Sequence, residues 1–110
     1  MLLERDQNIL QKALQEIELL EQMVQGIDVE TYLANEEKMR ATAMTLINIW
    51  ELVKHLSSDF KQSAKDFPFD EIRAMRHIAA HEYQTLKFEN VWDTIKEDIP
   101  TIKEQIEESL

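Results

Sequence analysis

Glycine and proline are almost missing from this chain, which has one glycine and two prolines in 110 residues. Hairpins and tight turns depend on these two residues, whereas the abundant Leu, Glu, Gln, Lys and Ala favour helix. The sequence therefore predicts an all-α protein. Its length predicts one domain, residues 1–110, and so small a domain would gain buried surface by forming a homodimer.

Apolar residues recur every three or four positions through most of the chain, as they do in amphipathic helices. Gly26 is the expected stop of the first helix, and Pro100 is expected to kink or split the last one. Asp28, Asn35 and Asp70 are expected to cap helices. The predicted helices cover residues 2–24, 28–33, 36–56, 60–64, 70–83 and 88–110. We expect an antiparallel bundle of four to five helices.

The predicted helix 36–56 is apolar on an unusually broad arc. A helix of this kind is usually buried on two sides, here by its own core and by a partner chain. The apolar positions are Met39, Ala43, Met44, Leu46, Ile47, Ile49, Trp50, Leu52, Val53 and Leu56.

The charge and cysteine content limit where the protein works and what it binds. There is no cysteine, no signal-peptide pattern and no apolar run long enough to span a bilayer. We therefore expect a cytoplasmic protein without a membrane or a disulfide. The net charge of −10 argues against general binding to a phosphate backbone, so DNA is not an expected partner. Any RNA site must be a local basic patch.

Residues 69–83 contain such a patch, with two arginines, two histidines and a tyrosine within about four helical turns. At about 100° per residue, Arg73, Arg76, His77 and His81 fall on one arc, and Tyr83 lies at its edge. Large apolar residues are missing from this arc. They fall on the opposite side of the helix, at Ile72, Met75, Ile78, Ala79 and Leu86.

Two kinds of chemistry fit this arc, besides a simple solvated face. RNA cleavage without a metal needs a base, an acid and a cation for the phosphoryl oxygens, which histidine and arginine supply. Alternatively, His77 and His81 have the i, i+4 spacing of two metal ligands. The third ligand would have to be His55 or a carboxylate. We expect no metal and no cofactor.

A single copy of the helix does not bring Arg76 and His81 together. They point about 140° apart and are separated by about 7.5 Å of helical rise. Two copies related by a two-fold axis would place the arginine of one subunit opposite the histidine of the other. A shared site in a homodimer is therefore the predicted arrangement.

The pattern Arg76-x-x-x-x-His81-x-Tyr83 resembles the signature of HEPN-domain proteins, in particular the HepT-like ribonuclease toxins. The likeness covers residues from about 37 onward and includes the stretches 48–57, 69–76 and 91–100. It implies a HEPN-like helical homodimer that cleaves tRNA or mRNA without a metal. Arg76 and His81 would be the catalytic pair, and Arg73 and His77 would bind phosphate.

The resemblance also implies a partner, a minimal nucleotidyltransferase antitoxin that would silence the toxin by transferring AMP to Tyr83. Two positions depart from the family pattern. His77 replaces a polar amide, and Trp50 replaces a glycine, a change that predicts altered helix packing or a changed dimer contact. The alternative function is a non-catalytic HEPN subunit that binds a substrate or nucleotide for the nucleotidyltransferase.

Overall fold

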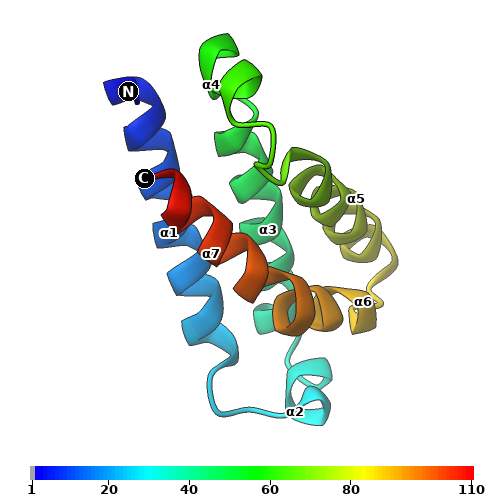
Figure 1. The fold of residues 1–110 in the computed structure, drawn as a ribbon. Coiled ribbons are helices and arrows are strands. Elements are labelled where there is room, and N and C mark those ends of the chain that lie inside the picture. Colours follow the sequence, from blue (N-terminus) through cyan, green and yellow to red (C-terminus); the bar gives the residue numbers. More distant parts are fainter. Residues whose placement is uncertain (1) are drawn as a thin grey trace.

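The computed structural model describes residues 2–110; Met1, the first residue of the predicted domain, lies outside them. The described chain is all helical, as predicted, with four long helices and shorter segments between them (Figure 1). The elements are α1 (Glu4–Val24), α2 (Val29–Leu33), α3 (Glu36–Val53), α4 (Ser58–Ser63), α5 (Phe69–Thr85), α6 (Glu89–Asp93), the π-helix η1 (Thr94–Asp98) and α7 (Ile99–Ser109).

Polar caps explain most of the helix starts. The side chain of Asp28 accepts a hydrogen bond from the Thr31 backbone N–H at 2.8 Å, and Asn35 accepts one from the Lys38 N–H at 3.0 Å. Both caps confirm the sequence predictions. Gly26 follows the end of α1 with a φ of 75°, a conformation that glycine adopts without strain.

The structure corrects the predicted bounds at α3 and α5. Helix α3 ends at Val53, three residues early, because the chain turns there toward α4. Helix α5 begins after Pro68, and Asp70 does not cap it. The Asp70 carboxylate lies within the first turn and instead accepts a hydrogen bond from Arg73 at 2.9 Å.

The predicted core position of Leu86 is also wrong. Helix α5 ends at Thr85, and Leu86 terminates it in a left-handed conformation with a φ of 58°. The change in backbone direction turns this side chain away from the core, so it is 48% exposed. The helical spacing that placed Leu86 on the apolar stripe no longer applies once the helix has ended.

Pro100 divides the last helical stretch, as predicted. A proline has no backbone N–H, so the Lys96 carbonyl lacks its usual partner four residues on. The backbone before Pro100 forms a π-helix, in which each carbonyl bonds to the residue five positions later. The stretch predicted as residues 88–110 is therefore three successive segments, α6, η1 and α7.

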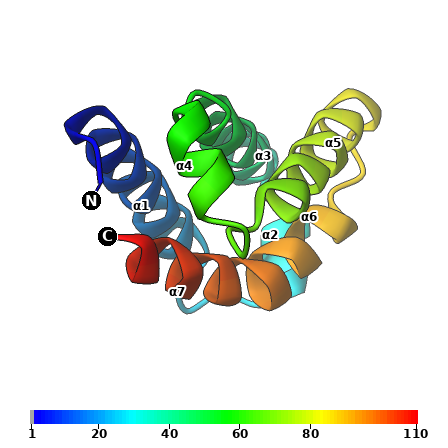
Figure 2. The ribbon, with the colours of Figure 1, turned by 45° about the horizontal axis from the view of Figure 1, so that its top comes forward.

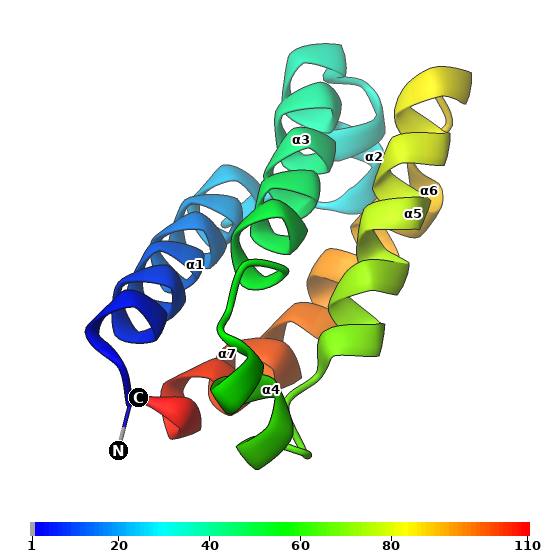
Figure 3. The same ribbon diagram turned by 90° about the horizontal axis from the view of Figure 1, so that it is seen from above.

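The long helices form a layer covered on one side. Helices α1, α3 and α5 lie in a row, and α7 runs obliquely across one side of that row (Figures 2 and 3). No other helix of residues 2–110 covers the opposite side, where the outer stripe of α3 is exposed. Within the same residues, no helix is both long enough and apolar enough to cross a membrane.

One apolar core joins these helices. It is built from the predicted apolar faces of α1, α3, α5 and α7, with aromatic residues from the short segments closing its ends. Its largest fully buried side chains include Tyr32, Phe88, Leu10, Ile17, Leu20, Leu46, Ile49, Ile72, Met75, Ile99 and Ile106.

Tyr32 is the buried residue whose polar group has the clearest physical consequence. Its hydroxyl and that of Thr42 are hydrogen bonded at 2.7 Å, and its ring lies 5.0 Å from that of Trp92. Burial raises the pKa of Tyr32 from 10.0 to about 12, and Glu82 adds a smaller upward contribution. The folded protein therefore keeps this proton at a pH where the unfolded chain has lost it.

This pKa difference predicts a loss of stability at alkaline pH. Unfolded Tyr32 loses its proton near its usual pKa, so the free energy of unfolding falls as pH rises from about 10 to about 12. We expect Tyr32 to contribute about 2 to 3 kcal/mol to this loss. Urea unfolding of the wild type and Tyr32→Phe across this range measures it. The variant should lose less stability with pH, and equal losses in both proteins would contradict the assignment.

Candidate active site on helices α3 and α5

Helix α5 separates its side chains into two faces, as the sequence indicated. Ile72, Met75 and Ala79 are buried against the core. On the other side, Arg73, His77 and His81 are exposed, and Arg76 and Tyr83 are half-buried. The predicted polar arc therefore exists as a surface of one continuous helix.

The structure does not bring Arg76 and His81 together within one chain. Both lie on the uninterrupted α5 helix, so five residues separate them by about 140° and about 7.5 Å of rise. Arg76 is on the side of α5 that borders α3, whereas His81 points into solvent. A single phosphate in contact with Arg76 would be out of easy reach of His81 of the same chain.

Helix α3 contributes residues to this surface that the sequence did not assign to it. The guanidinium carbon of Arg40 lies 5.3 Å from the centre of the Tyr83 ring. At the other end of the surface, the guanidinium carbon of Arg73 lies 6.0 Å from the centre of the Trp50 ring. These two contacts, each between α3 and α5, are cation–π interactions. The first of them places the predicted AMP acceptor, Tyr83, beside Arg40.

Glu51 of α3 provides the acidic neighbour of Arg76. Its carboxylate forms a 2.9 Å ion pair with Lys54, which is the main reason that the pKa of Glu51 is lowered. Electrostatic interactions with Arg76 and His55 lower this pKa further. Arg76 thus lies near a carboxylate in the absence of substrate.

The other arginines of the surface also have acidic neighbours. Arg73 pairs with Asp70 at 2.9 Å, and Arg40 pairs with Glu36 at 3.4 Å. The Tyr83 hydroxyl, together with Glu36, raises the pKa of Arg40. These pairs are solvent exposed, and such pairs contribute little to stability. A phosphate group can therefore replace the carboxylates at small energetic expense.

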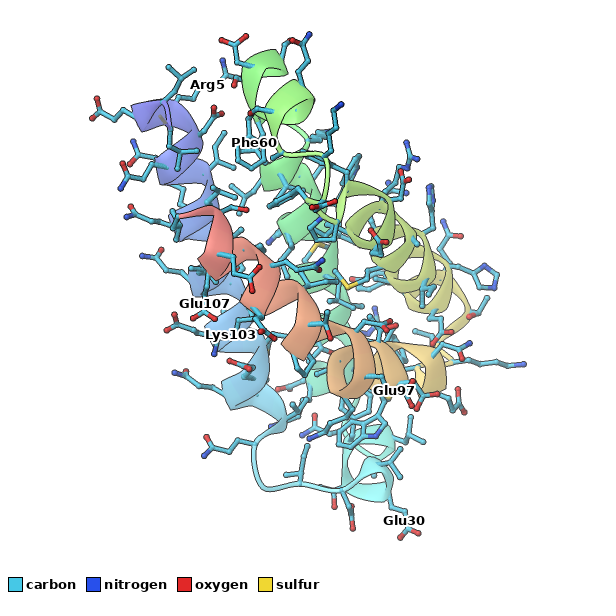
Figure 4. All side chains as sticks on the ribbon, in the orientation of Figure 1. Arg5, Glu30, Phe60, Glu97, Lys103 and Glu107 are labelled. Carbon is cyan, nitrogen blue, oxygen red and sulfur yellow. The ribbon has the colours of Figure 1, made fainter. Side chains whose placement is uncertain are left out.

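Acidic residues dominate the segment from η1 to α7, away from this surface. Figure 4 shows Glu97 and Glu107 projecting outward from it, and Lys103 nearby pairs with Glu21 of α1 at 2.9 Å. The acidic charge of this segment therefore lies apart from the Arg/His arc of α5. This arrangement leaves the α3 and α5 surface as the place where arginine and histidine gather.

Glu82, which the sequence reading did not include in the site, anchors the end of α5. It is 5% exposed, and its Oε1 accepts hydrogen bonds from the backbone N–H groups of Asn90 at 3.1 Å and Val91 at 3.2 Å. These donors lie in the first turn of α6, where they would otherwise be unpaired. In the sequence, this role is indicated by the position of Glu82, an acidic residue on the side of α5 that is buried.

Removing this anchor is expected to destabilise the protein. In Glu82→Ala two N–H groups lose their acceptor, and we expect the free energy of unfolding to fall by about 2 to 3 kcal/mol. Glu82→Gln keeps an acceptor oxygen and should lose less. Gln84→Ala, at an exposed position of the same helix, should change stability by less than about 0.5 kcal/mol. Urea unfolding measures all three. Equal stability of Glu82→Ala and Gln84→Ala would show that the anchor is unimportant.

The described residues provide no third ligand for a metal site at His77 and His81. His77 and His81 lie on the same side of α5 with the expected spacing. Among residues 2–110, however, no three His, Cys, Asp or Glu side chains are grouped so that they could hold a metal ion. Two imidazoles from one chain are fewer than the three or four protein ligands typical of zinc sites.

Comparison with known proteins identifies the family. The Ribonuclease HepT-like family matches residues 13–109 of the chain, which is most of its length. The chain belongs to this family. The family resemblance predicted from the sequence is confirmed.

Individual relatives agree with this assignment. A protein of Caldanaerobacter subterraneus subsp. tengcongensis named "Putative RNase" is 35% identical over 101 residues, covering 92% of this chain and 90% of the relative. The "Probable ribonuclease HepT" of Thermococcus cleftensis is 33% identical, covering 83% of each chain. A "Putative RNase" of Methanocaldococcus jannaschii is 32% identical, covering 74% of this chain and 70% of the relative. No solved structure gave a significant match.

Proposed function

We propose that this HepT-like chain is an endoribonuclease that cleaves RNA by attack of a ribose 2′-hydroxyl, without a metal ion. The observation that carries the proposal is the α5 surface, where Arg76 and His81 occur with the family spacing on an otherwise acidic protein. The family match supports ribonuclease activity as the function of this surface.

The proposed reaction gives each side chain a role. A neutral His81 takes the proton from the 2′-hydroxyl, and the 2′-oxygen bonds to phosphorus as the bond to the 5′-oxygen breaks. The protonated His81 then gives this proton to the departing 5′-oxygen, leaving a cyclic phosphate and a 5′-hydroxyl. Arg76 stabilises the charge on the phosphoryl oxygens. Arg73 and His77 bind neighbouring phosphates.

We propose that the working enzyme is a two-fold homodimer in which Arg76 of one subunit faces His81 of the other. The 140° between them on one helix supports this arrangement. So does the uncovered side of the helical row, where Met44 on the outer stripe of α3 is 44% exposed and Ile47 is partly buried beside it. Apolar side chains on such a surface are suited to an isologous contact.

The proposal is tested by incubating the purified protein with tRNA or total RNA in EDTA. We expect cleavage with products that end in a cyclic phosphate, and a solution mass of a dimer. Absence of cleavage, or cleavage that needs an added divalent ion, would overturn the proposed reaction. A strict monomer that cleaves RNA would overturn the shared site.

We further propose that a nucleotidyltransferase antitoxin silences the enzyme through Tyr83. The Tyr83 oxygen would attack the α-phosphorus of ATP, forming a phosphodiester to AMP and releasing pyrophosphate. Tyr83 lies two residues from His81, and Arg40 over its ring provides a cation for the added phosphate. The added negative charge and bulk would block RNA from the surface.

The expected result is that such a transferase and ATP add AMP to the wild type, with loss of RNA cleavage, but leave Tyr83→Phe unmodified and active. Mass spectrometry and a cleavage assay on the same samples measure both. Tyr32→Phe is the matched control, because Tyr32 is buried and should not react. Modification that persists in Tyr83→Phe would assign the acceptor to another residue.

A non-catalytic binding subunit is the second candidate. The observation that favours it is the pairing of arginines with carboxylates, as in Arg73 with Asp70 and Arg76 near Glu51. These acids oppose RNA binding in the free protein. The EDTA cleavage assay separates the two candidates, because only the enzyme shortens the RNA.

A further inference from the structure

Two arginine–aromatic pairs lie along the seam between α3 and α5. One is Arg73 with Trp50 and the other is Arg40 with Tyr83. In each pair the two side chains come from different helices, and in one pair the arginine belongs to α5 while in the other it belongs to α3. The pairs are therefore a property of the packed fold, and neither helix has them by itself.

The spacing of the pairs is the same on both helices. Residues 40 and 50 are ten positions apart on α3, and residues 73 and 83 are ten positions apart on α5, so the pairs are about 15 Å apart along each helix. Arg76 lies between the two pairs, one turn from Arg73. A nucleic acid strand with one phosphate on Arg76 would extend toward a pair on either side.

The guanidinium of each pair is in contact with its neighbours and is also partly open to solvent. The carbon of each guanidinium lies over an aromatic ring, and one of its nitrogens bonds a carboxylate: Asp70 for Arg73, and Glu36 for Arg40. The side chains of Arg73 and Arg40 nevertheless remain 55% and 39% exposed. This exposure leaves room for a base beside each guanidinium, while the ring and the carboxylate restrict where the guanidinium can lie.

We propose that Arg40 and Arg73 are stacking platforms for unpaired bases on either side of the phosphate bound by Arg76. The substrate class of this site is therefore single-stranded RNA. Guanidinium planes stack well on flat rings, and RNA-binding proteins use arginine and aromatic planes to hold unstacked bases. Bases inside a duplex already stack on each other and cannot reach such planes. This inference rests on the proposed ribonuclease function and adds its substrate class.

Replacing arginine with lysine distinguishes base stacking from attraction by charge alone. Arg73→Lys and Arg40→Lys keep the positive charge but remove the plane. If the arginines only attract phosphate, lysine should serve nearly as well, and the identity of the nucleobase should not matter. If they stack, the loss should appear only with ligands that carry bases.

The test measures binding by fluorescence anisotropy to two non-cleavable strands of about 12 nucleotides, a 2′-O-methyl oligoadenylate and an abasic chain of the same length. We expect the wild type to bind the oligoadenylate at least roughly tenfold more tightly than the abasic chain. Each lysine variant should lose most of this preference, with abasic binding changed less than about twofold. A duplex of the same length should bind like the abasic chain.

Arg5→Lys is the matched control, since Arg5 is an exposed arginine at the start of α1, where it bonds to the His55 carbonyl at 2.8 Å (Figure 4). It should keep the wild-type preference for bases. Trp50→Leu, checked for folding by thermal unfolding, removes the support under Arg73 and should resemble Arg73→Lys.

Three results would overturn the inference: equal wild-type binding to both strands, no binding to either, or a full preference for bases in both lysine variants. Failure of the proposed reaction gives a different result. If the protein prefers bases but does not cleave RNA, the stacking platforms are supported and the proposed reaction is wrong. If it cleaves RNA without any preference for bases, the proposed reaction is supported and the stacking platforms are wrong.

Discussion

His81→Ala is expected to lower the rate of RNA cleavage by about 10²- to 10⁴-fold, the usual contribution of a general acid or base. The imidazole is proposed to move the proton of the 2′-hydroxyl, and alanine has no group that can replace it. Because His81 is exposed, the substitution should change the free energy of unfolding by less than about 0.5 kcal/mol. The variant would therefore lose catalytic activity while keeping its fold.

Single-turnover cleavage in EDTA, with enzyme in excess over RNA, measures this loss without a contribution from product release. His55→Ala is the matched control, because His55 is an exposed histidine near the end of α3, outside the α5 arc. It should cleave at close to the wild-type rate. His81→Ala with the wild-type rate would remove His81 from the reaction, and a similar loss in His55→Ala would point to an indirect effect.

The helical fold could be predicted from the sequence because its signals are local. Asn35 caps α3 by accepting a hydrogen bond from the backbone N–H of Lys38, three residues later. Pro100 alters the backbone within one helical turn. Two local expectations were wrong because of where α5 begins and ends. Asp70 could cap α5 by sequence, but it lies inside the first turn and pairs with Arg73 of the same helix, and Leu86 leaves the core because the helix ends at Thr85. The oblique path of α7 depends on packing between helices, which no short pattern records.

In the site, too, only the residues that depend on local signals could be predicted. The arc on α5 follows from helical spacing within a single segment, so its five residues could be found from the sequence. The contributions of α3 could not, because Arg40, Trp50 and Glu51 lie 20 to 45 positions away and reach α5 only after the helices pack. The role of Glu82 could not be predicted either, because its carboxylate accepts backbone hydrogen bonds only once α6 has folded back beside it.

Mixing two inactive variants tests the shared site most directly. Arg76→Ala keeps His81, and His81→Ala keeps Arg76, so neither homodimer has a complete site. In a mixed dimer, the arginine of one chain and the histidine of the other restore one of the two sites. After equal amounts are mixed and allowed to exchange subunits, half of the dimers are mixed. The sample should therefore regain about a quarter of the wild-type cleavage rate.

The double variant Arg76→Ala/His81→Ala provides the control. Mixed dimers of this variant with the wild type contain no complete composite site, so an equal mixture should keep about a quarter of the wild-type rate. If each site lay within one chain, that mixture would keep about half. The decisive measurement is the rate of the Arg76→Ala and His81→Ala mixture, with dimer exchange verified by mass. Recovery to about a quarter is the predicted result, and a mixture as inactive as its components would contradict the composite site.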